Sequence, residues 1–96
     1  MTARIIMKRN VTPDKVKDLI PLLKKMRNAC MNQPGYIAGE TLKDYNDPGK
    51  YVVISTWETI EHWNQWASSS QRLEIQNQID YLLGEETEYG IYVYAL

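Results

Sequence analysis

Three segments of this 96-residue sequence have the composition of β-strands, and none of them has a polar face. Alternate side chains of a strand point to opposite sides of its sheet, so the residues divide by parity. The segment at 51–57 divides into Tyr51, Val53 and Trp57 against Val52, Ile54 and Thr56. The other two divide into Ile91, Val93 and Ala95 against Tyr92, Tyr94 and Leu96, and into Ile5 and Met7 against Ile6. An antiparallel sheet with one solvated face alternates apolar with polar residues, so this sheet has to be covered on both sides.

The residues after the first strand predict one long helix. We expect a strand over residues 3–10 and then a helix start, with Thr12 as the N-cap and Pro13 at the first helical position. Apolar residues then recur in steps of three and four, the pattern of one buried helix face: Val16, Leu19, Ile20, Leu23, Met26 and Cys30. Pro21 predicts a kink but not an end, because the apolar stripe continues beyond it. The sequence QPG at 33–35 ends the helix.

The second half of the chain predicts two strands, two helices and a last strand. Residues 36–45 and 50–58 have strand composition and are joined by the turn sequence NDPG. A helix capped by Thr59 and a further helix closed by Gly84 follow, and residues 89–96 form the last strand. The apolar residues of these two helices are Ile60, Trp63 and Trp66, and then Leu73, Ile75, Ile79, Leu82 and Leu83.

This order of elements predicts an α+β fold. The order β-α-β-β-α-β is the ferredoxin-like arrangement, in which a four-stranded antiparallel sheet carries its helices on one face. A chain of 96 residues has the length of one domain. We therefore expect a single domain over residues 1–96.

The helices can cover only one face of such a sheet, and no other segment is left to cover the second face. Three or four strands expose an apolar area on the order of several hundred Å². At about 25 cal/mol per Å², covering this area from two partners offers roughly 20–30 kcal/mol, against an association cost of ~4–15 kcal/mol. We therefore expect a homodimer. The alternative is a ligand or a loop that covers the second face.

The charge and cysteine content exclude several classes of function. The 11 Lys and Arg nearly balance the 12 Asp and Glu, and this argues against nucleic acid as a partner, because phosphate binding needs clustered basic residues. No apolar run approaches the roughly 20 residues that cross a bilayer, so we expect no membrane partner. The one cysteine, Cys30, cannot form an intrachain disulfide and falls on an apolar helix face. With no signal peptide, the sequence predicts a cytoplasmic protein.

Three short stretches resemble one known family. They are residues 33–37 (QPGYI), 54–58 (ISTWE) and 63–68 (WNQWAS). In this order and at this spacing they are similar to the antibiotic biosynthesis monooxygenase (ABM) domain family, and the resemblance extends from Arg4 to Tyr94. It implies a dimeric α+β barrel, in which two sheets pack face to face, and a cavity in each subunit between sheet and helices. Members of the family include cofactor-independent oxygenases of polycyclic phenols and quinones, haem-degrading enzymes, and proteins with no demonstrated activity.

Trp66 and His62 are the candidate catalytic residues. By resemblance, Trp66 occupies the position of the family's tryptophan at the cavity wall; the alternative is that Trp63 and Trp66, three apart on a helix, are both core residues. His62 is the only histidine and therefore the one side chain whose ordinary pKa lies near neutrality. It could take a proton from a phenolic substrate. The alternative is a surface residue beside two glutamates.

The candidate substrate-binding residues combine aromatic side chains of the sheet with positions that the resemblance implies at the cavity. They are Met7, Tyr51, Trp57, Trp66 and Gln76. In the haem-degrading branch, the positions of Met7 and Gln76 hold an asparagine and a histidine, so the resemblance argues against haem degradation here. One histidine and one distant cysteine make no metal-ligand set, and no phosphate-binding glycine motif is present. We therefore expect no metal and no cofactor.

Two hypotheses about function follow. The first is a small cofactor-independent monooxygenase that acts on an aromatic or quinone-like molecule held beside Trp66. The second is a non-catalytic dimeric module that binds a small apolar molecule or has a structural role. The feature of the sequence that favours the second hypothesis is the absence of an evident acid–base pair.

Overall fold

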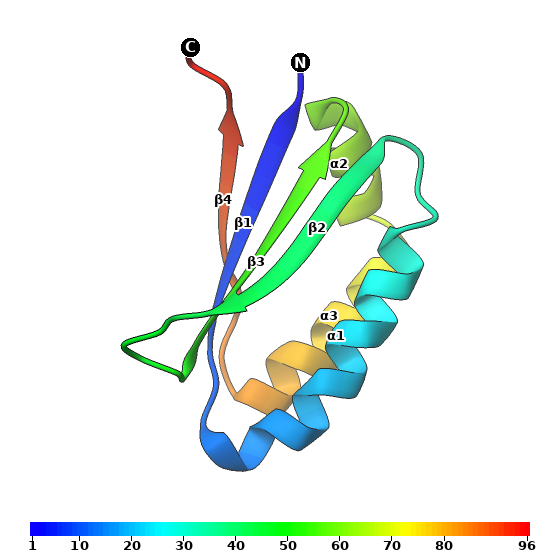
Figure 1. Cartoon of the computed structure of the whole chain (residues 1–96). Helices are drawn as coiled ribbons and strands as arrows, with labels where there is room; N and C mark the ends of the chain where they lie inside the picture. The colour runs from blue at the N-terminus through cyan, green and yellow to red at the C-terminus, as the bar shows by residue number, and fades with distance from the viewer.

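The computed structural model describes all residues, 1–96, and confirms the predicted α+β fold class. Four strands form one antiparallel sheet, and the helices lie on one of its faces (Figure 1). Two helices separate the third and fourth strands, as the sequence predicts, so the full order is β-α-β-β-α-α-β. The elements are β1 (Ala3–Asn10), the short 3₁₀ helix η1 (Pro13–Lys15), α1 (Val16–Cys30), β2 (Tyr36–Lys43), β3 (Lys50–Trp57), α2 (Ile60–Ala67), α3 (Ser70–Leu83) and β4 (Glu88–Val93).

The sheet has the strand order β2-β3-β1-β4, with β1 and β3 in the centre. In the register, Ile5 of β1 lies opposite Ser55 of β3 on one side and Ile91 of β4 on the other. The pairing of β2 with β3 is regular except for a shift between Tyr36 and Ala38. The strand β2 is an edge strand, and it lies above α1 in Figure 1.

The predicted division of β1 by parity is confirmed. Its odd-numbered residues face the helices and are buried: Ala3, Ile5, Met7 and Arg9. Its even-numbered residues face the other side, where Ile6 is half-buried and Lys8 is exposed. The charged residue on the buried side, Arg9, is the exception to an otherwise apolar row, and it becomes important for the site described below.

The outer face of the sheet is less uniformly apolar than expected. The register places its apolar residues together across the four strands: Ile6, Leu42, Val52, Ile54 and Tyr92. The same register places charged residues among them: Arg4, Lys8, Glu40 and Glu88. The expectation of an apolar outer face therefore holds for its centre, which has charged residues as neighbours.

Two clusters of buried side chains form the core between sheet and helices. The first combines strand residues with α1 and α2: Ala3, Ile5, Met7, Cys30, Trp57, Trp63 and Trp66. The second joins α1 to α3 near the opposite end of the sheet: Val11, Leu19, Ile75 and Ile79. The predicted apolar stripe of α1 is confirmed, since none of its six residues is exposed.

Most of the predicted element ends are confirmed. The hydroxyl of Thr59 accepts a hydrogen bond from the backbone N–H of His62 at 3.2 Å, so Thr59 caps α2. Gly84 ends α3 with a φ of 74°, in the left-handed region that favours glycine. Thr12 is an N-cap residue followed by Pro13, as predicted, but the helix that begins there is the 3₁₀ turn η1, and the Thr12 side chain caps no helical N–H. The prediction that the last strand continues to residue 96 is wrong, since β4 ends at Val93.

Candidate functional site

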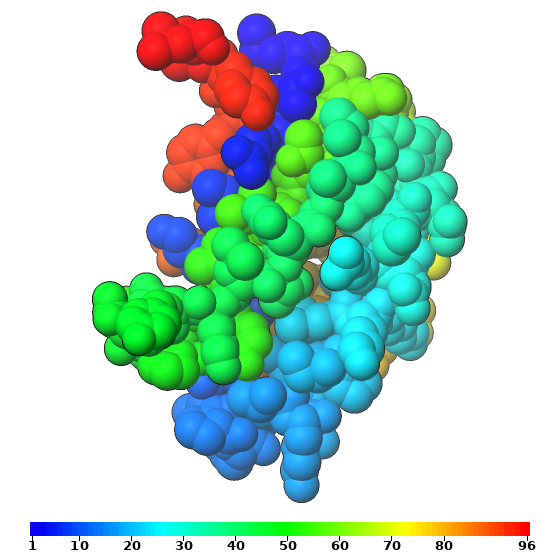
Figure 2. Space-filling view, viewed as in Figure 1, coloured from blue at the N-terminus to red at the C-terminus, as the bar shows by residue number.

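A cavity lies between the sheet and the helices, beside β2. Figure 2 shows a gap in the surface between β2 and α1, and the lining residues of the cavity come from these elements and from the central strands, α2 and α3. Its apolar lining consists of Met7, Leu23, Met26, Val53, Trp63 and Trp66. Polar groups line the rest, and among them are three arginines: Arg9, Arg27 and Arg72. The site is therefore an apolar space with a positively charged part.

The cavity encloses about 60 Å³. One water molecule needs about 10–15 Å³, whereas a cavity that binds benzene measures about 150 Å³. A ligand with one aromatic ring therefore requires some lining side chains to move. Met7, Met26 and Arg27 are long and unbranched, and Arg27 is exposed, so these side chains can change rotamer at small cost.

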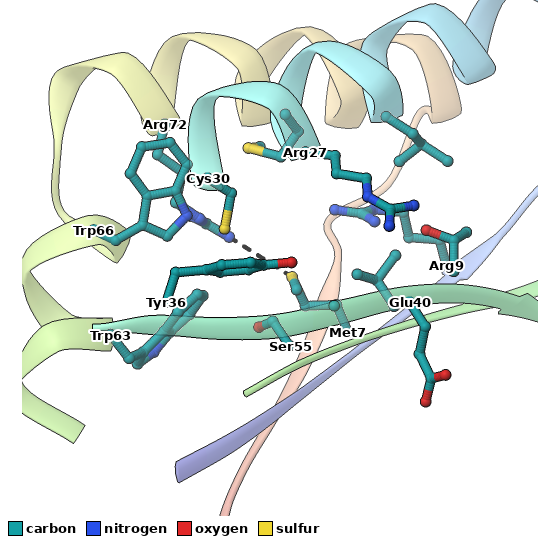
Figure 3. A pocket seen from close by; sticks show the side chains of 15 residues that line it. Met7, Arg9, Arg27, Cys30, Tyr36, Glu40, Ser55, Trp63, Trp66 and Arg72 are labelled. Carbon is teal, nitrogen blue, oxygen red and sulfur yellow. Dashed lines mark hydrogen bonds between the residues drawn. The ribbon is translucent and has the colours of Figure 1, made fainter. Parts of the chain in front are cut away.

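Aromatic rings form one wall of the cavity (Figure 3). Trp66 of α2 is 3% exposed and lies across the cavity from Tyr36 of β2. Behind this wall, the fully buried ring of Trp57 contacts Tyr36 edge-on, with centroids 5.5 Å apart, and contacts Trp63 at 5.9 Å. Nε1 of Trp57 donates a hydrogen bond to Oγ of Ser55 at 3.1 Å. Trp57 thus holds two lining rings in place without lining the cavity itself.

Gly39 allows the ring of Tyr36 to lie flat against β2. A β-carbon at residue 39 would be 2.6 Å from the Tyr36 hydroxyl oxygen, closer than any side chain permits. Burial raises the pKa of the Tyr36 phenol above its ordinary value, and the neighbouring Cys30 raises it further. The phenol therefore stays protonated at neutral pH and presents an O–H group at this end of the cavity.

Two buried arginines also line the cavity, and Figure 3 shows Arg72 beside Trp66. Arg9 donates from Nε to Thr87 Oγ1 at 3.0 Å and from Nη2 to Gln76 Oε1 at 3.2 Å. Arg72 donates to the same Gln76 oxygen at 3.5 Å and to the hydroxyl of Tyr89. Burial lowers the pKa of Arg9, and the positive charge of Arg72 lowers it further, whereas Tyr89 and Asp80 oppose this shift. Two like charges are thus held close together in a poorly solvated place.

Arg72 is also positioned by two aromatic rings. The centre of its guanidinium lies 5.2 Å from the ring centroid of Trp63 and 5.2 Å from that of Tyr89. A guanidinium over an aromatic face is attracted by the negative potential of the ring. These contacts fix the side chain of Arg72 at the cavity wall, and its Nη2 also reaches the sulfur of Met7 at 4.0 Å.

The predicted substrate-binding residues occupy different places. Met7 and Trp66 line the cavity. Gln76 lies behind the arginines as their shared acceptor, and Trp57 lies behind the aromatic wall. Tyr51 packs against the second core cluster, away from the cavity. Two of the five candidates therefore line the cavity, and two more contact residues that line it.

His62 lies outside the cavity lining, against the loop before β2. Its Nδ1 is 2.7 Å from Thr59 Oγ1, so the imidazole is tied to the residue that caps α2. On its other side, a β-carbon at Gly35 would lie only 2.2 Å from His62 Cγ. These contacts join the start of α2 to the turn that precedes β2. His62 thus packs between these two segments, and its catalytic role stays a prediction.

Sequence reasoning missed the two buried arginines. The signal for Arg9 was present, because parity places it on the inward face with Ile5 and Met7. Arg72 begins a buried stripe on α3 at helical spacing, followed by Ile75, Gln76 and Ile79. A charged residue at a position that a periodic pattern assigns to the interior is a candidate for function, because its burial needs a partner.

Two further classes of site have no structural basis here. No three His, Cys, Asp or Glu side chains gather closely enough to hold a metal ion. None of the helices combines the length and the hydropathy that crossing a bilayer requires.

The structure is a small ferredoxin-like domain with a cavity between its sheet and helices, and comparison with known proteins identifies the family. Residues 2–78 match the family model described as antibiotic biosynthesis monooxygenase, and the chain belongs to this ABM family. No curated protein matches the sequence.

Solved structures share the fold at low sequence identity. A conserved protein from Methanosarcina mazei Go1 superposes with a TM-score of 0.88 at 24% identity, covering 96% of this chain and 91% of that one. Rv0793 from Mycobacterium tuberculosis gives 0.87 at 16% identity, covering 100% and 97%. SnoaB, a cofactor-independent oxygenase from Streptomyces nogalater, gives 0.82 at 13% identity, covering 99% and 94%. At these identities the likeness concerns the fold.

Proposed function

We propose that this protein is a small monooxygenase that acts on an aromatic or quinone-like molecule in the cavity beside Trp66, without a metal or flavin. The observation that carries the proposal is the group of aromatic rings in the cavity lining: Trp66, Trp63 and Tyr36 line a space that is mostly apolar apart from its arginines. Planar rings stack favourably on such aromatic side chains. Membership of the ABM family and the shared fold of SnoaB, a cofactor-independent oxygenase, support it.

The chemistry that fits such a site draws all its electrons from the substrate. A methylene carbon between two aromatic rings reacts with O₂ to give a ketone and water, so the carbon loses four electrons and O₂ gains them. The substrate first loses a proton and becomes an electron-rich anion, and that proton returns in the water formed. Once lining side chains such as Met26 and Arg27 have moved aside, the cavity would hold the ring system and exclude bulk water. His62 takes part in no step of this scheme, because it lies outside the cavity lining.

Oxygen consumption with a panel of hydroxylated anthrones and hydroquinones tests the proposal. We expect turnover above the uncatalysed rate for at least one compound, and a loss of at least tenfold in kcat/KM in Trp66→Phe, which keeps an aromatic ring but changes the wall. Tyr81→Phe is the control, since Tyr81 is 91% exposed and lies far from the cavity on α3. His62→Ala should retain the activity of the folded protein.

The absence of turnover with every compound would contradict the proposal, as would full activity in a folded Trp66→Phe variant. Folding of each variant is checked by its thermal unfolding transition. This check matters because Trp66 belongs to the first core cluster, and a change in its size can lower stability without touching chemistry.

A second candidate function is a non-catalytic module that binds a small aromatic molecule. One observation favours it: neither a histidine nor a carboxylate is directed into the cavity. Glu40 is the one acidic residue in the lining, and Figure 3 shows its carboxylate directed away. Ligands that raise the melting temperature without consuming oxygen would support this function over the first.

We also propose that the protein is a cytoplasmic, single-domain homodimer whose sheets pack face to face. Two features support the dimer. The outer face of the sheet has an apolar centre around Ile54. The edge strand β4 and the residues after it expose large apolar side chains, on both faces of the sheet within β4: Tyr89, Ile91, Tyr92, Val93, Tyr94 and Leu96. An exposed apolar edge strand tends to associate with another chain. The free thiol of Cys30 suits a reducing compartment.

A further inference from the structure

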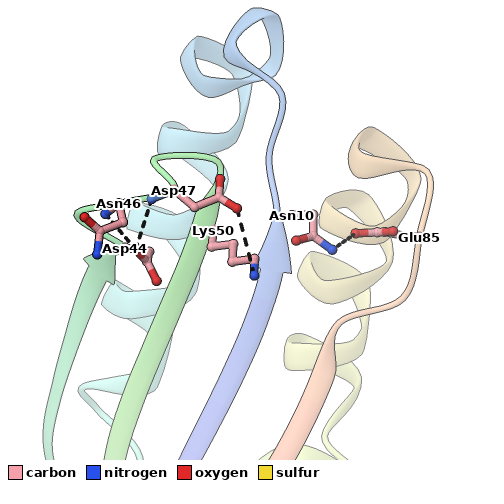
Figure 4. A network of polar contacts seen from close by, with 6 residues as sticks. All are labelled: Asn10, Asp44, Asn46, Asp47, Lys50 and Glu85. Carbon is pink, nitrogen blue, oxygen red and sulfur yellow. Dashed lines mark hydrogen bonds and ion pairs between the residues drawn. The ribbon is translucent and has the colours of Figure 1, made fainter.

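Two arginines are buried in the lining of the cavity without an ion-pair partner. Arg9 is 6% exposed and Arg72 is 4% exposed. The one ion pair of the chain joins Lys50 to Asp47 at 3.9 Å in the exposed β2–β3 turn (Figure 4). This turn lies at the end of the sheet far from α2 (Figure 1). Buried charges in proteins are normally paired, because transferring an ion out of water is costly.

The protein supplies less negative charge than these arginines need. Asp80 is the nearest carboxylate of the network, but its Oδ1 accepts from Gln76 Nε2 at 2.8 Å and from Thr87 Oγ1 at 3.1 Å. It contacts neither guanidinium. Asp80 is half-buried, and only the neutral side chains of Gln76 and Thr87 connect it to the two guanidiniums. One negative charge near two positive charges leaves an excess of positive charge at the cavity.

The guanidiniums also keep donors free. Arg9 uses Nε and Nη2, and Arg72 uses Nη2, so neither Nη1 donates to a protein acceptor. No buried side-chain nitrogen or oxygen lacks a hydrogen-bond partner. The free Nη1 groups therefore reach accessible space, and the cavity is the space that both arginines line.

We propose that the cavity binds an aromatic carboxylate, with the carboxylate held by Arg9 and Arg72 and the ring lying between Trp66 and Tyr36. The planar guanidinium fork matches the two oxygens of a carboxylate. The apolar side chains of the cavity lining disfavour a strongly hydrated anion without a hydrophobic body. Arg27, exposed at the mouth, adds positive charge on the path of entry. This inference rests on the cavity of the proposed function and narrows its substrate class.

Binding of benzoate, benzamide and acetate to the full chain tests the inference. Benzamide has the shape of benzoate without its charge, and acetate has the charge without the ring. Neither aromatic probe reacts with O₂, so the titration reports binding alone. In two-dimensional ¹H–¹⁵N NMR titrations, we expect benzoate to bind about tenfold more tightly than either control. The indole N–H of Trp66 and the Nε–H signals of Arg9 and Arg72 should shift. Raising the sodium chloride concentration should weaken benzoate binding and leave benzamide binding unchanged.

Variants that remove one positive charge test whether Arg9 and Arg72 bind the carboxylate. Arg9→Gln and Arg72→Gln should each reduce benzoate affinity about tenfold and abolish its preference over benzamide, whereas Lys17→Gln on the exposed side of α1 should change neither. If either arginine variant fails to fold, the comparison of probes and the salt dependence in the wild-type protein decide the question.

Equal affinity for benzoate and benzamide, no benzoate binding at millimolar concentration, or an unchanged preference in folded arginine variants would overturn the inference. If one of these results is obtained, oxygen consumption with a neutral substrate would still support the proposed function. Conversely, a carboxylate preference without any oxygenase activity would support this inference and count against the proposed function.

Discussion

The imidazole of His62 occupies the space where a side chain at Gly35 would lie, and a β-carbon there would be 2.2 Å from His62 Cγ. Gly35 also has a φ of 81°, in the left-handed region. The next contact along the chain strengthens this junction, since the backbone N–H of Glu58 donates to the Gly35 carbonyl at 2.7 Å. The one histidine of the sequence therefore packs the start of α2 against the turn before β2.

Gly35→Ala tests this packing. The substitution introduces both an unfavourable backbone conformation, costing about 1–2 kcal/mol, and a clash with His62. We expect the free energy of unfolding to fall by about 2–4 kcal/mol in total. Urea denaturation at a fixed protein concentration measures it, because a dimer's stability depends on concentration.

The double variant separates the two causes. In a His62→Ala background the clash is absent, so Gly35→Ala should cost only the backbone part, about 1–2 kcal/mol. Strict additivity of the two single variants would show that His62 does not fill this space. A large loss of oxygenase activity in His62→Ala at unchanged stability would instead assign the histidine to catalysis.

The thiol of Cys30 should affect stability only at high pH. Burial raises its pKa from 9.0 to about 11, and the charge of Arg72 partly opposes this. Between these two values the folded protein keeps the thiol proton and the unfolded chain loses it. The free energy of unfolding therefore falls by about 1–3 kcal/mol as the pH rises from 9 to 11. Chemical denaturation across this range measures the slope.

Cys30→Ala is the control for this slope, because lysine and tyrosine side chains ordinarily titrate in the same pH range and also change the free energy of unfolding. The difference between wild type and variant should decrease as the pH rises through it, whereas a constant difference would contradict the raised pKa. Alkylation by iodoacetamide at pH 8 offers an independent check: we expect slow reaction in the native protein and fast reaction in urea.

The fold follows from local patterns that the sequence displays directly. The alternation in β1 and the helical stripe of α1 each depend on residues close together in the chain, and so do the cap at Thr59 and the glycine at Gly84. The start of the first helix was the exception. Thr12 and Pro13 were expected to begin an α-helix, and they begin the 3₁₀ turn η1 instead, because both kinds of helix begin with the same residue types.

The site was harder to predict, because it depends on contacts between distant segments. Met7 and Trp66 line the cavity as expected, but the hydrogen bond between Arg9 and Gln76 joins residues 67 positions apart. No periodic pattern reveals that Gln76 is shared with Arg72. The assembly and the roles of the site residues remain predictions, since they depend on a second chain and on a ligand.

The proposed dimer predicts that a charge in the centre of the outer sheet face prevents association. Ile54 lies on this face opposite Ile6 of β1 and Glu40 of β2. Ile54→Lys places an ammonium group in the expected interface, where it would be desolvated without a partner. We expect a dimer for the wild type and a monomer for the variant by light scattering at micromolar concentration.

Tyr81→Lys provides the matched control, since it adds the same charge at a side chain that is 91% exposed on α3. It should remain dimeric. A monomeric wild-type protein would contradict the dimer, and an Ile54→Lys variant that still dimerises would move the interface elsewhere, with the exposed strand β4 as the next surface to test.

Gly39→Ala should change the cavity with little effect on the fold. The new methyl group would lie 2.6 Å from the Tyr36 hydroxyl, so the end of that ring has to move away from β2. Only the tip of the side chain is displaced, and we expect a stability loss of about 1 kcal/mol or less. The cavity encloses only about 60 Å³, however, and a displaced ring enters it. We therefore expect benzoate affinity to fall about tenfold in the NMR titration.

Removing the hydroxyl should reverse this effect, because the methyl group of residue 39 would then meet no oxygen. The double variant Gly39→Ala/Tyr36→Phe is expected to recover most of the benzoate affinity, while Tyr36→Phe alone should resemble the wild type. If Gly39→Ala binds benzoate as well as the wild type does, the ring of Tyr36 is not a wall of the binding site. Loss of binding in all three variants would instead make the phenol O–H a ligand contact in its own right.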